Sequence, residues 1–157
     1  MKTKNPKIKL LFRDSYLRVI QNSVGSRMFR NFLGLIDGRE ADLLKNGELS
    51  CAYFVCCILR LFDLINKVHL TVNGTIVDMK KFGWYGIKSL RKGCIVLWEN
   101  QVVGGEQHSH IGFYIGHGKA VSNSSTKRIV TLHDVAFGNR RRVVSIYWHK
   151  RISQRIF

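Results

Sequence analysis

The segment from Cys51 to Ile65 constrains the fold most, because only Arg60 and Asp63 carry charge within it. Ser50 precedes the segment and is a favourable N-terminal cap for a helix. A helix that is apolar on every side has to be covered on every side. The sequence therefore predicts a buried helix around which the remaining chain packs.

The hydropathy pattern changes from helical to alternating near Gly93. Before it we expect mostly helix and loop, and after it consistent strands. The fold class predicted is α+β, with N-terminal helices and an antiparallel sheet or partial barrel packed on the buried helix. We expect one domain over 1–157, with a helical extension at 1–45 and a catalytic core at 46–148. The expected helical segments are 14–21, 28–33 and 41–45; a hairpin is expected at 68–77, strands at 94–98, 110–115, 119–123, 128–133 and 142–148, and a polar loop at 100–109.

Positive charge is concentrated at the two ends of the chain. The formal net charge is +16, and residues 1–30 and 127–157 each hold eight Lys/Arg against one Asp. A strongly basic surface favours polyanions such as nucleic acid, anionic membrane or an acidic cell-wall polymer, although a merely solubilising surface has the same composition. We interpret the flanks as a docking feature for an anionic polymer.

The apolar segments are too short to cross a bilayer. The longest uncharged run, 49–59, is about half of the roughly 20 residues that a membrane span needs. The basic start of the chain is followed by only three apolar residues before Arg13, so no classical export signal is predicted. We expect a cytoplasmic protein, or one that reaches a cell wall by a non-classical route.

The cysteine pattern argues against zinc and against a disulfide framework. Cys51, Cys56, Cys57 and Cys94 show no C-x-x-C spacing, and the six histidines form no H-x-x-x-H pair. Three of the thiols lie within one apolar segment, as expected for reduced cysteines in a core. No metal or cofactor is predicted.

Cys51 is nevertheless a candidate nucleophile. A thiol in the first turn of a helix receives the positive end of the helix dipole and unpaired backbone N–H groups, which favour the thiolate. It also needs a base, and His110 opens a predicted strand that can pack against the helix end. A buried structural thiol is the commoner arrangement for such a residue.

Three blocks of sequence resemble the NlpC-type cysteine peptidases of cell walls, in order and in spacing. The resemblance extends over about residues 46–148, and the third block, a strand that begins with His and runs through Gly and Tyr to a Gly turn, is the most specific. The blocks are LSCAYFV at 49–55, GIKSLRKGCIVLW at 86–98 and HIGFYIGHGKAVS at 110–122.

The resemblance implies a papain-like fold with Cys51 as the nucleophile and His110 as the general base. In the family a third polar residue on the next strand, often His and sometimes Asn or Gln, holds the imidazole; Ser122 stands at that place. We favour Asn123, whose amide oxygen can accept from an imidazole, with Ser122 as the alternative, because a strand directs the two to opposite faces. His133 on the following strand is a further candidate.

The blocks also depart from the family pattern. Ser50 replaces the family's Asp, Ala52 and Tyr53 replace Ser and Gly, and Cys94 replaces an Asp after Gly93. The first three changes alter the walls beside the nucleophile and therefore the bond that is recognised. Cys94 is interpreted as structural.

The sequence as a whole predicts a monomeric cysteine hydrolase that cleaves an amide bond in peptidoglycan stem peptides or a related peptide. Three alternatives stay open: a basic nucleic-acid-binding module, an inactive binding descendant of the fold, and an acyltransferase of related fold that acts on lipids. A recognisable nucleic-acid-binding motif is absent from the sequence.

Overall fold

The computed structural model describes residues 7–103 and 105–154 and has a mixed α+β architecture, as the sequence predicted. The α-helices of the described chain are α1 (Phe12–Asn22), α2 (Cys51–Leu61) and α3 (Val72–Lys81). A 3-10 turn, Lys150–Ser153, follows the last strand.

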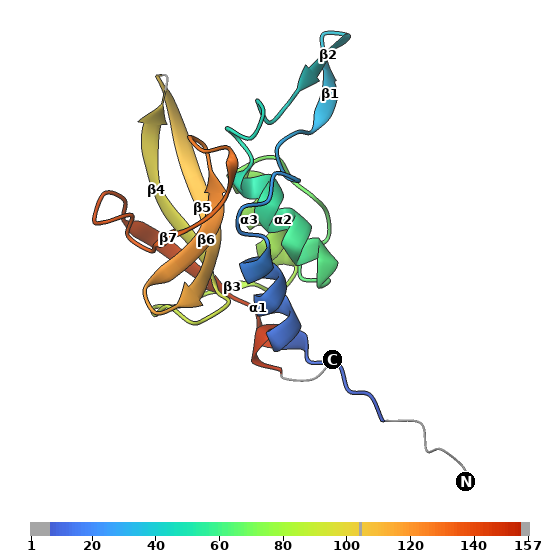
Figure 1. Ribbon diagram of the computed structural model, residues 1–157, viewed down its shortest axis with the longest axis vertical. Helices are drawn as coiled ribbons and strands as arrows, with labels where there is room; N and C mark the ends of the chain where they lie inside the picture. The colour runs from blue at the N-terminus through green and yellow to red at the C-terminus, as the bar shows by residue number, and fades with distance from the viewer. Residues whose placement is uncertain (1–6, 104, 155–157) are drawn as a thin grey trace.

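Six antiparallel strands form the main sheet, in the order β3-β8-β4-β5-β6-β7. The helices lie on one side of this sheet, and a separate hairpin of β1 and β2 projects from the body (Figure 1). The strands are β1 (Leu33–Ile36), β2 (Arg39–Asp42), β3 (Tyr85–Gly86), β4 (Ile95–Val103), β5 (Glu106–Gly116), β6 (Lys119–Ser124), β7 (Ile129–Asp134) and β8 (Val143–Trp148).

Helix α2 packs against β5 and β6 and supplies the centre of the core. Phe54 is fully buried and meets Phe113 of β5 edge to face, with ring centroids 5.5 Å apart. The helix ends at Leu61, four residues before the predicted end, because Asp63 adopts a left-handed backbone conformation with φ of 49°. The predicted buried helix is therefore present but shorter.

Helix α3 replaces the hairpin that was predicted at 68–77. The Asn73-Gly74 pair, typical of a hairpin turn, lies in the first helical turn instead. Thr71 caps this turn, since its Oγ1 accepts a hydrogen bond from the Gly74 N–H at 3.2 Å. Ile76 packs against the core and Met79 is fully buried. The cap and these apolar contacts stabilise a helix where the turn motif alone predicted strands.

The predicted polar loop at 100–109 is also wrong, because β4 runs to Val103 and β5 begins at Glu106; Gly104 lies outside the described residues. Gln101 pairs with His108, and Val102 pairs with Gln107. This end of the hairpin extends beyond the core, so both faces of it meet solvent or a cleft, and the apolar alternation that marks a strand disappears. The extension carries one wall of the candidate site.

The segments 28–33 and 41–45 were predicted to be helical, but neither forms a helix. Residues 28–33 form turns that lead into β1, and residues 41–45 leave β2 through a turn. The Asp37-Gly38 pair turns the hairpin. Later in the chain, Trp84 is buried and Tyr85 is 49% exposed.

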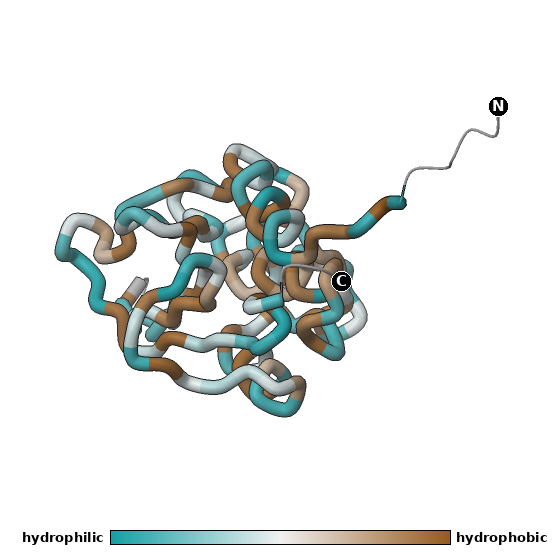
Figure 2. Tube along the Cα trace, turned by 90° about the horizontal axis from the view of Figure 1, so that it is seen from below, coloured by the Kyte–Doolittle hydropathy of each residue, from teal (hydrophilic) through white to brown (hydrophobic). Residues whose placement is uncertain are grey.

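Apolar and polar stretches alternate along most of the chain (Figure 2). In the part of the chain that the structure describes, no helix combines the length and the apolar character that crossing a membrane would need.

Candidate functional site

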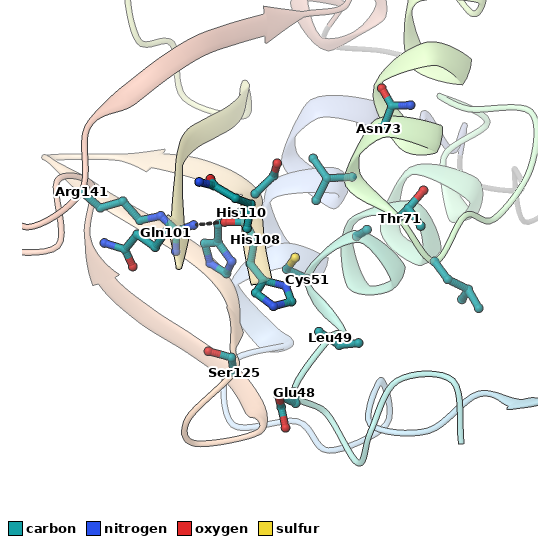
Figure 3. Close-up of a pocket in the computed structure, with 15 residues that line it drawn as sticks. Glu48, Leu49, Cys51, Thr71, Asn73, Gln101, His108, His110, Ser125 and Arg141 are labelled. Atoms are coloured by element: carbon teal, nitrogen blue, oxygen red, sulfur yellow. Dashed lines mark hydrogen bonds between the residues drawn. The ribbon is translucent and has the colours of Figure 1, made fainter. Parts of the chain in front are cut away.

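A cleft opens where the start of α2 faces β4 and β5. Cys51 begins α2, His110 lies on β5, and Arg141 lies just before β8; all three line the cleft. Residues 70–73 at the start of α3 line the opposite side. Figure 3 shows Cys51 and the histidine side chains of β5 at the same cleft.

The Cys51 thiol is held in its neutral form at neutral pH. Burial raises its pKa, and the backbone N–H groups of Ile111 and Ala52 and the charge of Arg141 oppose that effect in part. Cys51 and His110 share no hydrogen bond in this structure. A buried thiol with a raised pKa needs a base if it is to act as a nucleophile near pH 7.

The His110 imidazole belongs to a chain of hydrogen bonds that crosses three strands. His110 Nε2 lies 2.8 Å from Ser122 Oγ on β6, and the same oxygen lies 2.8 Å from His133 Nε2 on β7. His133 Nδ1 in turn lies 2.8 Å from the carbonyl oxygen of Asp134. Ser122 and His110 are both buried.

The direction of these bonds follows from their last member. The Asp134 carbonyl can only accept, so His133 Nδ1 carries the proton and His133 Nε2 accepts. Ser122 therefore donates to His133 and accepts from His110 Nε2. His110 is left with an unprotonated Nδ1, which has no partner among the described residues and is available to take a proton.

Aromatic rings enclose the two histidines. Trp98 lies 5.3 Å from His110 and 5.6 Å from His133 between ring centroids. Phe137 stacks on His133 at 4.0 Å. Burial, with the nearby charge of Arg141 and the nearby His133, lowers the pKa of His110 to about 3. The imidazole is therefore neutral at physiological pH and its Nδ1 can accept a proton, although a pKa this low makes the unliganded imidazole a weak base.

Gly112 permits the close approach of β5 and β6 on which the His110 contact depends. A Cβ at this position would lie 2.7 Å from the Val121 carbonyl oxygen and 2.8 Å from the Ser122 Cβ. The first of these atoms is backbone and cannot move aside without shifting the strand. The glycine two residues after His110 thus has a packing role beside the site.

Asn123, favoured from the sequence as the partner of His110, faces away from it. Its Nδ2 donates to the Gly47 carbonyl at 2.8 Å and to the Ser124 carbonyl at 3.4 Å. The alternative, Ser122, makes the contact with His110. The strand alternation separated the two residues correctly, but alternation alone does not say which of them faces His110. The pairing of β5 with β6 places Ser122 on the His110 face.

The predicted capping role of Ser50 is likewise not observed. Its side chain makes no capping bond, and its buried hydroxyl has no hydrogen-bond partner among the described residues. The first backbone N–H groups of α2 are therefore not occupied by a capping side chain, which leaves them free for an anion.

Sequence reasoning missed two residues of the cleft. His108 is half-buried and lines the cleft, whereas His117 is exposed. Arg141 belongs to a basic run, 140–142, that was interpreted only as surface charge. Its inward position depends on β8 pairing with β4, which no local pattern reveals.

The described residues contain no cluster of three or more His, Cys, Asp or Glu side chains arranged to hold a metal ion. What the arrangement offers is an uncapped helix start beside a thiol, and a neutral imidazole with one free nitrogen. These groups suit nucleophilic attack by sulfur on a carbonyl carbon.

No protein-family model matches this chain, and no curated protein does. A solved structure of NlpC2 from Trichomonas vaginalis resembles it with a TM-score of 0.54 at 14% identity, over 93% of this chain and 49% of that chain. This protein thus spans about half the length of that neighbour, and the likeness at this identity is one of fold.

Proposed function

We propose that this protein is a cysteine hydrolase with Cys51 as nucleophile and His110 as general base. The observation that carries the proposal is the hydrogen-bond chain from His110 through Ser122 to His133, because it leaves His110 Nδ1 unprotonated in a cleft shared with Cys51. The NlpC2-like fold supports it independently.

The proposed reaction is acyl transfer to sulfur followed by hydrolysis. Cys51 Sγ attacks the amide carbonyl carbon as its proton passes to His110 Nδ1, and the N–H groups at the start of α2 stabilise the oxyanion. The imidazolium then protonates the departing amine as the C–N bond breaks. Water attacks the resulting thioester with His110 again as base, which releases the acid and the free thiol.

Ser122 and His133 act through His110 in this proposal. As His110 becomes positively charged, its Nε2–H bond to Ser122 strengthens, and Ser122 keeps that acceptor role only while it donates to His133. The two residues thereby keep the ring in one tautomer and one orientation, which is the task of the third member of a catalytic triad.

The substrate class we propose is the stem peptide of peptidoglycan or a related peptide. Its supports are the resemblance of the three sequence blocks to cell-wall peptidases and the name of the structural neighbour. The net charge of +16 suits a polyanionic wall polymer. Ser50, Ala52 and Tyr53 differ from the family pattern beside the nucleophile and therefore alter which bond is recognised.

The test is incubation of the protein with purified peptidoglycan, with new amino groups and released muropeptides measured by labelling and mass spectrometry. The wild type should release products, and Cys51→Ala and His110→Ala should not. Cys57→Ala is the matched control, because Cys57 is a second partly buried thiol on the same helix. It should retain activity.

A cysteine-directed acylating probe gives a second measurement that needs no natural substrate. We expect the probe to modify Cys51 faster than Cys57 and Cys94, and His110→Ala to remove the difference. Equal labelling of the three thiols in the wild type, together with the absence of new amino groups, would contradict the hydrolase proposal.

A further inference from the structure

Arg141 is held rigidly at the cleft that contains Cys51. Its Nε donates to the Glu99 carbonyl and its Nη2 donates to the His108 carbonyl, each at 2.9 Å. Figure 3 shows the guanidinium reaching β5 beside His108 and His110. These bonds to the backbone of β4 and β5 fix the group and use two of its five N–H donors.

Arg141 forms no salt bridge with a described carboxylate, although the charge of Glu99 lies near enough to act on it. The nearest acidic residue along β4, Glu99, accepts from its neighbour instead: Glu99 Oε2 lies 3.0 Å from Arg142 Nε, and Glu99 Oε1 accepts the Arg142 backbone N–H at 2.9 Å. The Arg141 guanidinium therefore contacts the backbone oxygen of Glu99 and not its carboxylate. A half-buried cation without a salt-bridge partner is more stable when a bound ligand supplies an anion.

The lining of the cleft also favours an anion. Among the described lining residues Glu48 is the sole carboxylate, and it lies 4.0 Å from Arg128 Nη2. Arg141 is near enough to the thiol for its charge to lower the pKa of Cys51. A group bound by Arg141 therefore lies close to the position where Cys51 meets a carbonyl.

We propose that Arg141 is a specificity residue that binds a carboxylate of the substrate beside the scissile amide. The inference rests on the proposed function and narrows its substrate class to peptides with a free carboxylate next to the cleaved bond. The fixed guanidinium, with donors left over and no salt bridge of its own, suits bidentate recognition of such a group.

Alkylation of Cys51 by two small reagents of similar shape tests the inference without a natural substrate. Iodoacetate carries a carboxylate next to its reactive carbon, and iodoacetamide carries a neutral amide there. The rate of each reaction at Cys51 is followed by peptide mass spectrometry at one pH. Both reagents react with the Cys51 thiolate, so the ratio of the two rates does not depend on the fraction of Cys51 that is ionised. This matters because Arg141 also influences that fraction.

We expect Arg141→Gln to lower the iodoacetate-to-iodoacetamide ratio at Cys51 about tenfold, as the loss of one charge-assisted hydrogen bond implies. Arg141→Lys, which keeps the charge without the planar fork, should give an intermediate ratio. Arg142→Gln is the matched control, since it removes the same charge from the adjacent, largely exposed side chain; its ratio should equal that of the wild type.

The outcomes separate this inference from the proposed function. An equal fall of the ratio in Arg141→Gln and Arg142→Gln would show a general effect of surface charge and overturn the assignment to Arg141. An unchanged ratio in both variants would overturn it too, even if peptidoglycan is cleaved. If neither reagent modifies Cys51, the cleft does not admit a ligand of this size, and the inference fails together with the hydrolase proposal.

Discussion

The two walls of the cleft differ in how firmly they hold their polar groups. On the sheet wall, His110 is fixed by Ser122 and His133 and is enclosed by aromatic rings. On the helix wall, the Cys51 thiol has no hydrogen bond to His110, and the adjacent Ser50 hydroxyl has no partner among the described residues. The base is thus organised before substrate binds, while the nucleophile and its helix start are left open.

This difference assigns separate tasks to sheet and helix. A preorganised imidazole lowers the reorganisation required in the transition state, and free N–H groups at the helix start can receive a developing oxyanion. Catalytic contacts in an unliganded site often close only when the substrate is bound. Substitutions on the sheet wall should therefore change His110, whereas substitutions at Ser50 should change stability alone.

The largest expected effect concerns acid stability. The pKa of His110 is about 3 in the folded protein against an ordinary value of 6.5, so between these pH values the unfolded chain binds a proton that the folded protein does not bind. The free energy of unfolding therefore keeps its full value above pH 6.5 and decreases as the pH falls towards 3, by at most about 5 kcal/mol. Urea unfolding at pH 7 and pH 4 measures it.

A matched pair of variants isolates that contribution. His110→Asn should lose less free energy of unfolding between pH 7 and pH 4 than the wild type, and His117→Asn, which changes an exposed histidine, should lose as much as the wild type. An equal pH dependence in the wild type and His110→Asn would show that His110 is not kept neutral by the fold.

The next effect breaks the relay on the sheet wall. Ser122→Ala and His133→Gln should each lower kcat/KM roughly 5- to 150-fold, which corresponds to about 1–3 kcal/mol of activation free energy. Either change breaks the chain of hydrogen bonds that fixes the orientation and tautomer of His110. Since the residues act in series, the double variant should be no worse than the poorer single variant. Ser124→Ala, two residues further along β6, is the control and should leave kcat/KM unchanged. Additive losses in the double variant would contradict the proposal that Ser122 and His133 act in series.

Asn123→Ala tests the opposite face of the same strand. The change removes the Nδ2 bond to the buried Gly47 carbonyl, so the free energy of unfolding should fall by about 1–2 kcal/mol. The turnover of folded protein should stay within a factor of two, since Asn123 does not contact His110. A loss of activity comparable with that of Ser122→Ala would restore Asn123 as the orienting residue.

The smallest effect is expected on the helix wall. Ser50→Ala removes a buried hydroxyl without a partner and should leave the free energy of unfolding unchanged or raise it by about 1 kcal/mol. Ser23→Ala is the control, because the buried Ser23 hydroxyl does donate to the Ile20 carbonyl at 2.6 Å. That variant should be destabilised; if Ser50→Ala is destabilised equally, Ser50 has a partner in solution.

The sequence was informative where one element determines the answer. Fifteen residues with two charges predicted the buried helix, and the strand beginning at His110 was predicted with its turn at 116–118. The same local reasoning produced a hairpin at Asn73-Gly74, because the competing signals were a capping bond from Thr71 and tertiary burial of Met79. An Asn-Gly pair therefore predicts a hairpin turn only where no helix cap or buried apolar face nearby favours a helix.

Within the site, the limit of prediction is the sheet register. Alternation along β6 placed Ser122 and Asn123 on opposite faces, which the structure shows, but it could not say which one meets His110. That outcome depends on the register of β5 and β6, where Phe113 pairs with Val121 and Ser122 therefore shares a face with His110. Arg141 depends similarly on the pairing of β8 with β4.

The tautomer of His110 decides whether its Nδ1 can act as the base, because the direction of the hydrogen bonds from Asp134 back to His110 leaves that nitrogen unprotonated. Nitrogen-15 NMR of histidine-labelled protein at pH 7, assigned with His110→Asn and His133→Gln, reports the protonation of each ring nitrogen. We predict a neutral His110 with the proton on Nε2 and a neutral His133 with the proton on Nδ1. A His110 ring protonated on Nδ1, or on both nitrogens, would contradict the account.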